Sequence, residues 1–76
     1  MGAPRTFYEY FLEMIYQGAK RETMEKAMLE AGVDESYFVL NKYWNNSEKI
    51  AQAAMDSADK VYEIDNGKIW IFKYRQ

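Results

Sequence analysis

The acidic residues are the first group in this 76-residue chain whose chemistry could support catalysis. There are twelve Asp and Glu residues, and two pairs, Glu9 with Glu13 and Glu22 with Glu25, have the spacing that places both carboxylates on one helix face. Those faces lie opposite the apolar stripes of the same segments, and a carboxylate in water is a poor general acid. The pairs therefore indicate solvated helix surfaces rather than a catalytic dyad.

Cysteine and histidine are both absent from the chain. Their absence excludes disulfides and thiolate nucleophiles, and it removes the commonest general base and the commonest metal ligand. The sequence also has no glycine-rich phosphate loop, no EF-hand loop and no nucleophile elbow. We therefore expect a protein that is not an enzyme and that holds no cofactor and no metal.

Three aromatic residues alternate near the end of the chain. Trp70, Phe72 and Tyr74 are two residues apart, so on a β-strand they share one face. If that face points away from the rest of the fold, it is an exposed aromatic stripe of the kind that marks protein interfaces. If it points inward, the same side chains are simply core. The first alternative makes Trp70, Phe72 and Tyr74 the expected partner-binding residues.

An antiparallel hairpin over residues 61–74 would hold these aromatic side chains. Asn66-Gly67 is a strong hairpin signal, because a tight two-residue turn needs positive φ at both of its central residues. A turn centred on this pair places Ile64 opposite Ile69. The second face of the hairpin is then also apolar and carries Tyr62, Ile64, Ile69 and Ile71.

Helical patterns precede the hairpin. Apolar residues at helical spacing predict helices over residues 5–17, 20–31 and 48–59. The stretch 35–45 fits either a helix or a strand, because its Tyr, Phe and Val residues favour a strand but do not alternate cleanly with polar residues. A helix gives this stretch the more coherent apolar face, so we expect a helix.

These elements predict an α+β fold in which three or four helices are followed by a C-terminal antiparallel β-hairpin. Residues 1–76 are expected to form a single domain, with residues 1–4 disordered or left from cloning. The turn between the segments 20–31 and 35–45 has the sequence Ala31-Gly32-Val33. A glycine followed by an apolar residue suits a tight helix-turn-helix.

This order of elements resembles that of winged helix-turn-helix proteins over about residues 20–74. The resemblance implies DNA binding, with the helix 35–45 in the major groove and the hairpin as the wing. The DNA-binding residues would then be Asn41, Lys42, Asn45, Lys49 and Lys68.

The charge and hydropathy of the chain limit its partners. The net charge of −2 disfavours non-specific binding to nucleic acid or to an anionic membrane. No apolar run approaches the ~18 residues of a membrane span, and Glu9 and Glu13 interrupt the apolar stretch near the N-terminus, unlike a secretory signal. The sequence therefore predicts a cytoplasmic protein with no membrane partner.

Two functions follow from these patterns. The first is a small non-enzymatic binding module that acts through protein–protein interaction, as compact regulators and inhibitors do. The second is sequence-specific DNA binding in the winged-helix manner. The oligomeric state stays open, and a dimer is one option.

Overall fold

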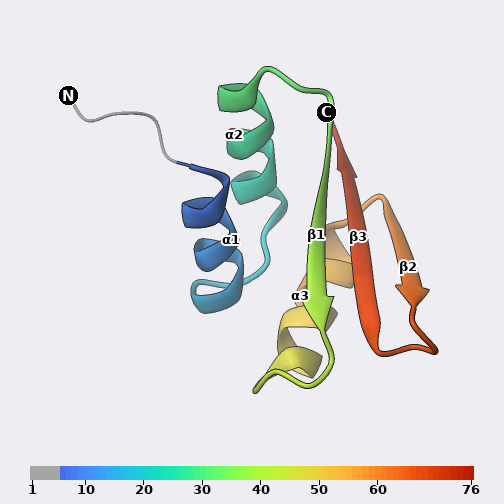
Figure 1. The fold of residues 1–76 in the computed structure, drawn as a ribbon. Coiled ribbons are helices and arrows are strands. Elements are labelled where there is room, and N and C mark those ends of the chain that lie inside the picture. The colour runs from blue at the N-terminus through green and yellow to red at the C-terminus, as the bar shows by residue number, and fades with distance from the viewer. Residues whose placement is uncertain (1–5) are drawn as a thin grey trace.

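The computed structural model describes residues 6–76, which form an α+β fold. The elements of these residues follow in the order α1 (Phe7–Tyr16), α2 (Arg21–Ala31), β1 (Glu35–Asn41), α3 (Ser47–Ser57), β2 (Lys60–Ile64) and β3 (Ile69–Arg75), as Figure 1 shows. The α+β class agrees with the sequence prediction. The prediction for residues 1–4 falls outside the described residues.

The helix preferred for residues 35–45 is wrong. Residues 35–41 form β1, which pairs antiparallel with β3 from Glu35 opposite Arg75 to Asn41 opposite Ile69. The strand is the more stable conformation because it forms a complete hydrogen-bonded ladder with β3, which lies far along the chain. No local sequence pattern shows that ladder. The helix that the winged-helix resemblance placed in the DNA major groove is therefore a strand over residues 35–41.

The three helices begin and end close to the predicted positions. Thr6 caps α1, and its hydroxyl oxygen accepts the backbone N–H of Glu9 at 3.2 Å. Gly32 ends α2 in the left-handed region, with φ of 70°. The last helix, α3, starts after Asn46, and the hydroxyl of Ser47 donates to the carbonyl oxygen of Lys42 at 2.9 Å.

The sheet has the strand order β1-β3-β2, so β3 lies in the centre and both ladders are antiparallel. Ile64 lies opposite Ile69, which is the register that the Asn66-Gly67 turn predicts. The turn itself is wider than two residues. Asp65, Asn66 and Gly67 all have positive φ, and the N–H of Lys68 reaches the carbonyl oxygens of both Ile64 and Asp65.

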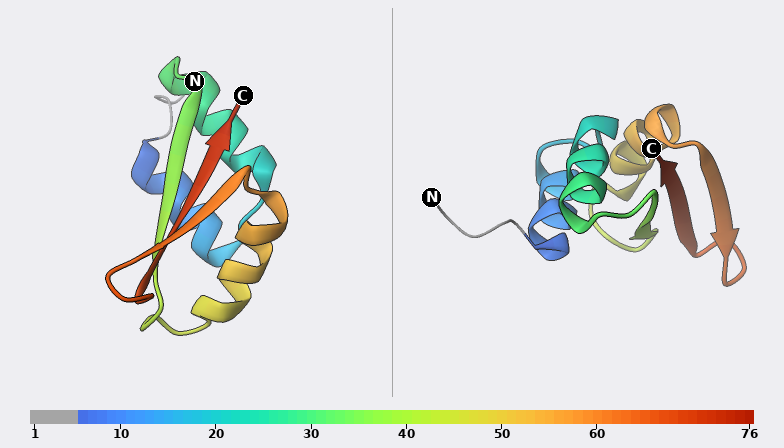
Figure 2. Two further views of the ribbon diagram at one scale, coloured as in Figure 1. Left: turned by 90° about the vertical axis from the view of Figure 1, so that its right-hand side faces the viewer. Right: turned by 90° about the horizontal axis from the view of Figure 1, so that it is seen from above.

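The helices cover one face of the sheet and leave the other face bare. Figure 2 (left) shows the strands in front with the helices behind them. The core between the layers combines side chains of all three helices with the inward-facing side chains of two strands: Met14, Met24, Met28, Phe38, Leu40, Ile50, Ala51, Ala54, Trp70, Phe72 and Tyr74. All five residues of β2 are exposed, because the helices do not cover this edge strand as they cover β1 and β3.

Within residues 6–76, no helix combines the length and the apolar character that crossing a membrane requires.

Candidate interaction surface

The aromatic stripe of β3 faces the helices. Phe72 and Tyr74 have no exposed surface and Trp70 is only 8% exposed. The prediction of a partner-binding stripe required these three side chains to be exposed, and that expectation is wrong. The physical reason is bulk: a small domain with this composition needs its largest rings to fill the space between sheet and helices. Phe72 stacks on Phe38 of β1 with 5.9 Å between ring centres.

The five residues predicted to contact DNA do not share one helix face. Asn41 ends β1, and its side-chain oxygen accepts the backbone N–H of Tyr43 at 2.8 Å. Lys42 and Lys68 are neighbours, because the N–H of Lys42 donates to the carbonyl oxygen of Lys68 at 3.0 Å. Asn45 lies in the loop before α3, and Lys49 lies on α3 itself. The structure thus brings together Asn41, Lys42 and Lys68 at one end of the sheet.

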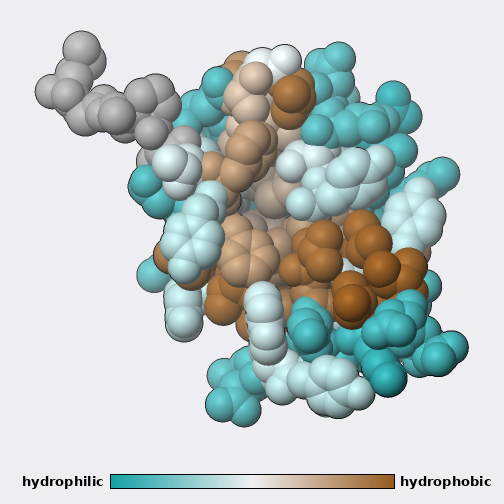
Figure 3. All heavy atoms as spheres, in the orientation of Figure 1, coloured by the Kyte–Doolittle hydropathy of each residue, from teal (hydrophilic) through white to brown (hydrophobic). Residues whose placement is uncertain are grey.

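The bare face of the sheet is an apolar feature to which the sequence assigns no function. Strand side chains alternate, so the odd-numbered residues of β1 and β3 point away from the helices. In Figure 3, hydrophobic side chains gather over the strands on this side. We call this surface the open face and define it by six residues: Tyr37, Val39, Tyr62, Ile64, Ile69 and Ile71.

The residues of the open face form one apolar row across all three strands and a second row across β3 and β2, with Tyr37 next to Val39 on β1. Ile71 lies between Val39 on one side and Tyr62 on the other, and Ile69 pairs with Ile64 in the next row. Tyr37, Val39, Tyr62 and Ile64 are 52%, 47%, 42% and 45% exposed, respectively. Water therefore touches about half of each of these four residues, although Ile69 and Ile71 join them into one patch.

One end of the open face is charged. Lys60 lies opposite Lys73, and the Lys73 ammonium is 3.4 Å from a carboxylate oxygen of Glu35. The guanidinium of Arg75 is 3.5 Å from the same carboxylate. Two cations thus contact one anion next to the apolar residues, and Lys60 lies beside them, which gives this end of the face a positive character.

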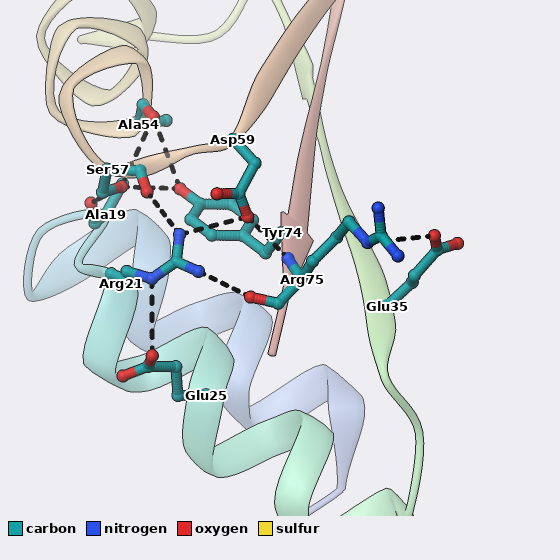
Figure 4. A network of polar contacts seen from close by, with 9 residues as sticks. All are labelled: Ala19, Arg21, Glu25, Glu35, Ala54, Ser57, Asp59, Tyr74 and Arg75. Carbon is teal, nitrogen blue, oxygen red and sulfur yellow. Dashed lines mark hydrogen bonds and ion pairs between the residues drawn. The ribbon is translucent and has the colours of Figure 1, made fainter.

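A polar cluster fastens the helices to the sheet beneath this charged end, as Figure 4 shows. The guanidinium of Arg21 donates to the carbonyl oxygens of Ser57 and Arg75, and it is 3.2 Å from the carboxylate of Asp59. The hydroxyl groups of Ser57 and Tyr74 are 2.7 Å apart. The starts of α2 and β2 and the ends of α3 and β3 therefore meet in one network, which fixes the sheet on its helices.

Two pKa values in this cluster are shifted. The backbone N–H of Arg75, with the Arg21 guanidinium, lowers the pKa of Asp59 from its usual value. Burial raises the pKa of the Tyr74 hydroxyl. Both groups serve the internal network, and nothing in their geometry provides a catalytic pair. Among residues 6–76, no group of acidic side chains is arranged to hold a metal ion.

Part of the open face could have been found from the sequence. Tyr62, Ile64, Ile69 and Ile71 are the second face of the predicted hairpin, so only the choice of face was missing. Tyr37 and Val39 were missed because residues 35–45 were expected to form a helix. Odd-numbered residues share one face of a strand but not one face of a helix.

The chain matches no protein-family model, no curated protein and no solved structure.

Proposed function

We propose that this chain is a small non-enzymatic binding module that acts through protein–protein interaction, and that its partner packs on the open face. The observation that carries the proposal is the contiguity of the six side chains. Single exposed apolar residues are ordinary on a protein surface, but a contiguous apolar patch on a sheet face usually has a partner.

The chemistry of the open face favours a protein over a nucleic acid. Four of its six residues are aliphatic (Val39, Ile64, Ile69 and Ile71), and aliphatic side chains give bases no ring to stack on. The net charge of −2 adds no general attraction to phosphates. An apolar centre with a charged rim at Lys60 and Lys73 is the usual anatomy of a protein interface.

The test is site-specific photo-crosslinking in the cells that make the protein, with benzoylphenylalanine in place of Tyr62 or of Tyr43. Both residues are exposed tyrosines, but Tyr62 lies on the open face and Tyr43 lies in the loop after β1. We expect one discrete protein adduct from position 62 that position 43 does not give. Equal adduct patterns from both positions would contradict the proposal, and a nucleic-acid adduct from position 62 would replace it.

DNA binding stays the alternative hypothesis, and it would have to use other elements than a helix over 35–45. Its remaining support is the pair Lys42 and Lys68 at one end of the sheet. Lys42 is already engaged, because its ammonium is 3.4 Å from the carboxylate of Glu63. A steep fall in DNA affinity with salt would favour this alternative.

A further inference from the structure

A groove without charged residues runs along the side of α1 that faces β1. It consists of two hollows of about 370 and 460 Å³ that share Phe11. Among the described residues, none that lines either hollow is acidic or basic. The first hollow lies between the start of α1 and the outer edge of β1, where Phe7 and Tyr8 are 54% and 68% exposed.

The edge of β1 beside this groove carries backbone groups that no other strand among residues 6–76 pairs with. The N–H of Lys42 donates to the carbonyl oxygen of Lys68, and the N–H of Gln76 donates to that of Asp34. These two bonds fix the alternation of the ladder, so the even-numbered residues of β1 bond to β3. The N–H and C=O groups of Glu35, Tyr37 and Val39 therefore point outward, along the groove.

The helix layer extends past the sheet on this side. Figure 2 shows α1 on the β1 side of the molecule, away from β2. Phe7 and Tyr8 are thus exposed beyond the edge of β1, where a further strand would cover them. The other edge has a different arrangement, because all five residues of β2 are exposed and the hollow that Lys60 shares with Arg21 of α2 is lined mainly by charged side chains.

We infer that an extended segment of the partner protein binds along β1 as a fourth strand, with alternate side chains entering the groove of α1. This inference rests on the proposed function and names the part of the partner that is recognised. An extended segment matches both features at once: its backbone pairs with Tyr37 and Val39, and its inward side chains meet the uncharged lining.

The charges specify the segment further. Because the groove lining is uncharged, the inward side chains should be apolar, and a charge there would lose its water without gaining a partner. The remaining side chains would lie beside Tyr37 and Val39 and extend the open face. A partner helix fits less well, because its backbone is already hydrogen-bonded and would leave the N–H groups of β1 covered but unpaired.

The probe is a displayed library of random peptides of about twelve residues, selected on the intact 76-residue chain. We expect selected peptides to have apolar residues at every second position and to slow amide hydrogen exchange at Tyr37 and Val39. Val39→Pro removes one outward N–H of β1, and it should weaken a selected peptide about tenfold or more. Val61→Pro, the matched control, removes an outward N–H from β2 and should leave the affinity unchanged.

Methylation of the peptide backbone keeps the test independent of the folding of these variants. In a bound strand, alternate peptide nitrogens face β1 and the others face away from it. Methylation of the nitrogens that face β1 should abolish binding, and methylation of the other set should not. Binding that survives both sets, or selected peptides with helical spacing, would overturn the fourth strand. If the crosslinker at position 62 still gives a protein adduct in that case, the proposed function stands without the fourth strand. If neither a peptide nor a protein binds, the proposed function and the fourth strand both fail.

Discussion

The ammonium group of Lys42 lies over the ring of Trp70, 4.3 Å from the ring centre. One of these residues was expected to contact DNA and the other to contact a protein, and instead they contact each other. The indole N–H of Trp70 is buried without a hydrogen-bond partner among residues 6–76. The cation above the ring is therefore a main polar interaction of this side chain.

Removing this cation should destabilise the fold slightly. Lys42→Met keeps most of the side chain but loses the charge, and we expect the free energy of unfolding to fall by about 0.5–1 kcal/mol. Urea unfolding followed by tryptophan fluorescence measures the change. Lys68→Met, in the neighbouring turn, is the control and should have a smaller effect. Equal losses in the two variants would show that the ring contact adds nothing.

Adjacent residues of β3 should respond very differently to substitution, because they lie on opposite faces. Phe72→Ala empties a fully buried site and should cost about 3–5 kcal/mol, which is close to the whole stability of a domain this small. Ile71→Thr, on the open face, keeps the β-branched shape and should cost less than about 1 kcal/mol. Thermal unfolding by circular dichroism distinguishes them, and the reverse ranking would mean that the sheet faces the helices the other way.

The hydroxyl of Tyr74 should contribute measurably to stability. It is 2.7 Å from the hydroxyl of Ser57, and Tyr74 is fully buried while Ser57 is partly buried. Tyr74→Phe should lower the free energy of unfolding by about 1 kcal/mol. Tyr43→Phe removes a hydroxyl from a side chain that is 74% exposed, so its urea midpoint should equal that of the unchanged protein. If the two variants unfold at the same urea concentration, the bond to Ser57 has no net value.

Acid should weaken the fold partly through Asp59. Its pKa is lowered in the folded protein, chiefly by the N–H of Arg75. A carboxyl group with a lowered folded pKa stabilises the fold above its unfolded pKa of about 3.9 and loses this contribution as the pH falls through the folded pKa. The urea midpoint should therefore fall more between pH 6 and pH 3 in the unchanged protein than in Asp59→Asn. Parallel pH profiles would assign the acid sensitivity to other carboxylates.

The sequence predicted the ends of the helices and the pairing of Ile64 with Ile69 well, because these depend on local chemistry, although the turn between the two strands is wider than the predicted two residues. The hydroxyl of Thr6, the left-handed glycine at position 32 and the Asn66-Gly67 pair act within a few residues of themselves. Such signals are visible in any window that contains them.

The strand β1 and the orientation of the sheet were missed for one shared reason. Both faces of the sheet are apolar, so Tyr37 and Val39 hide the alternation of Phe38 and Leu40. The same holds in β3, where isoleucines alternate with aromatic residues and either set could fill a core. The partner-binding surface that we propose is thus the feature that made the sequence ambiguous.

The central position of β3 has a consequence for how the chain folds. It is the last of the six elements in chain order, yet both ladders of the sheet depend on it. Until residues 69–75 dock, β1 has no partner strand, and its apolar side chains have no completed core to enter. Closing the long loop between β1 and β3 lowers the entropy of the chain, and no contacts offset this loss until the ladder forms. We therefore expect folding to be limited by this single late docking step, with the helices unable to hold a native sheet in advance of it.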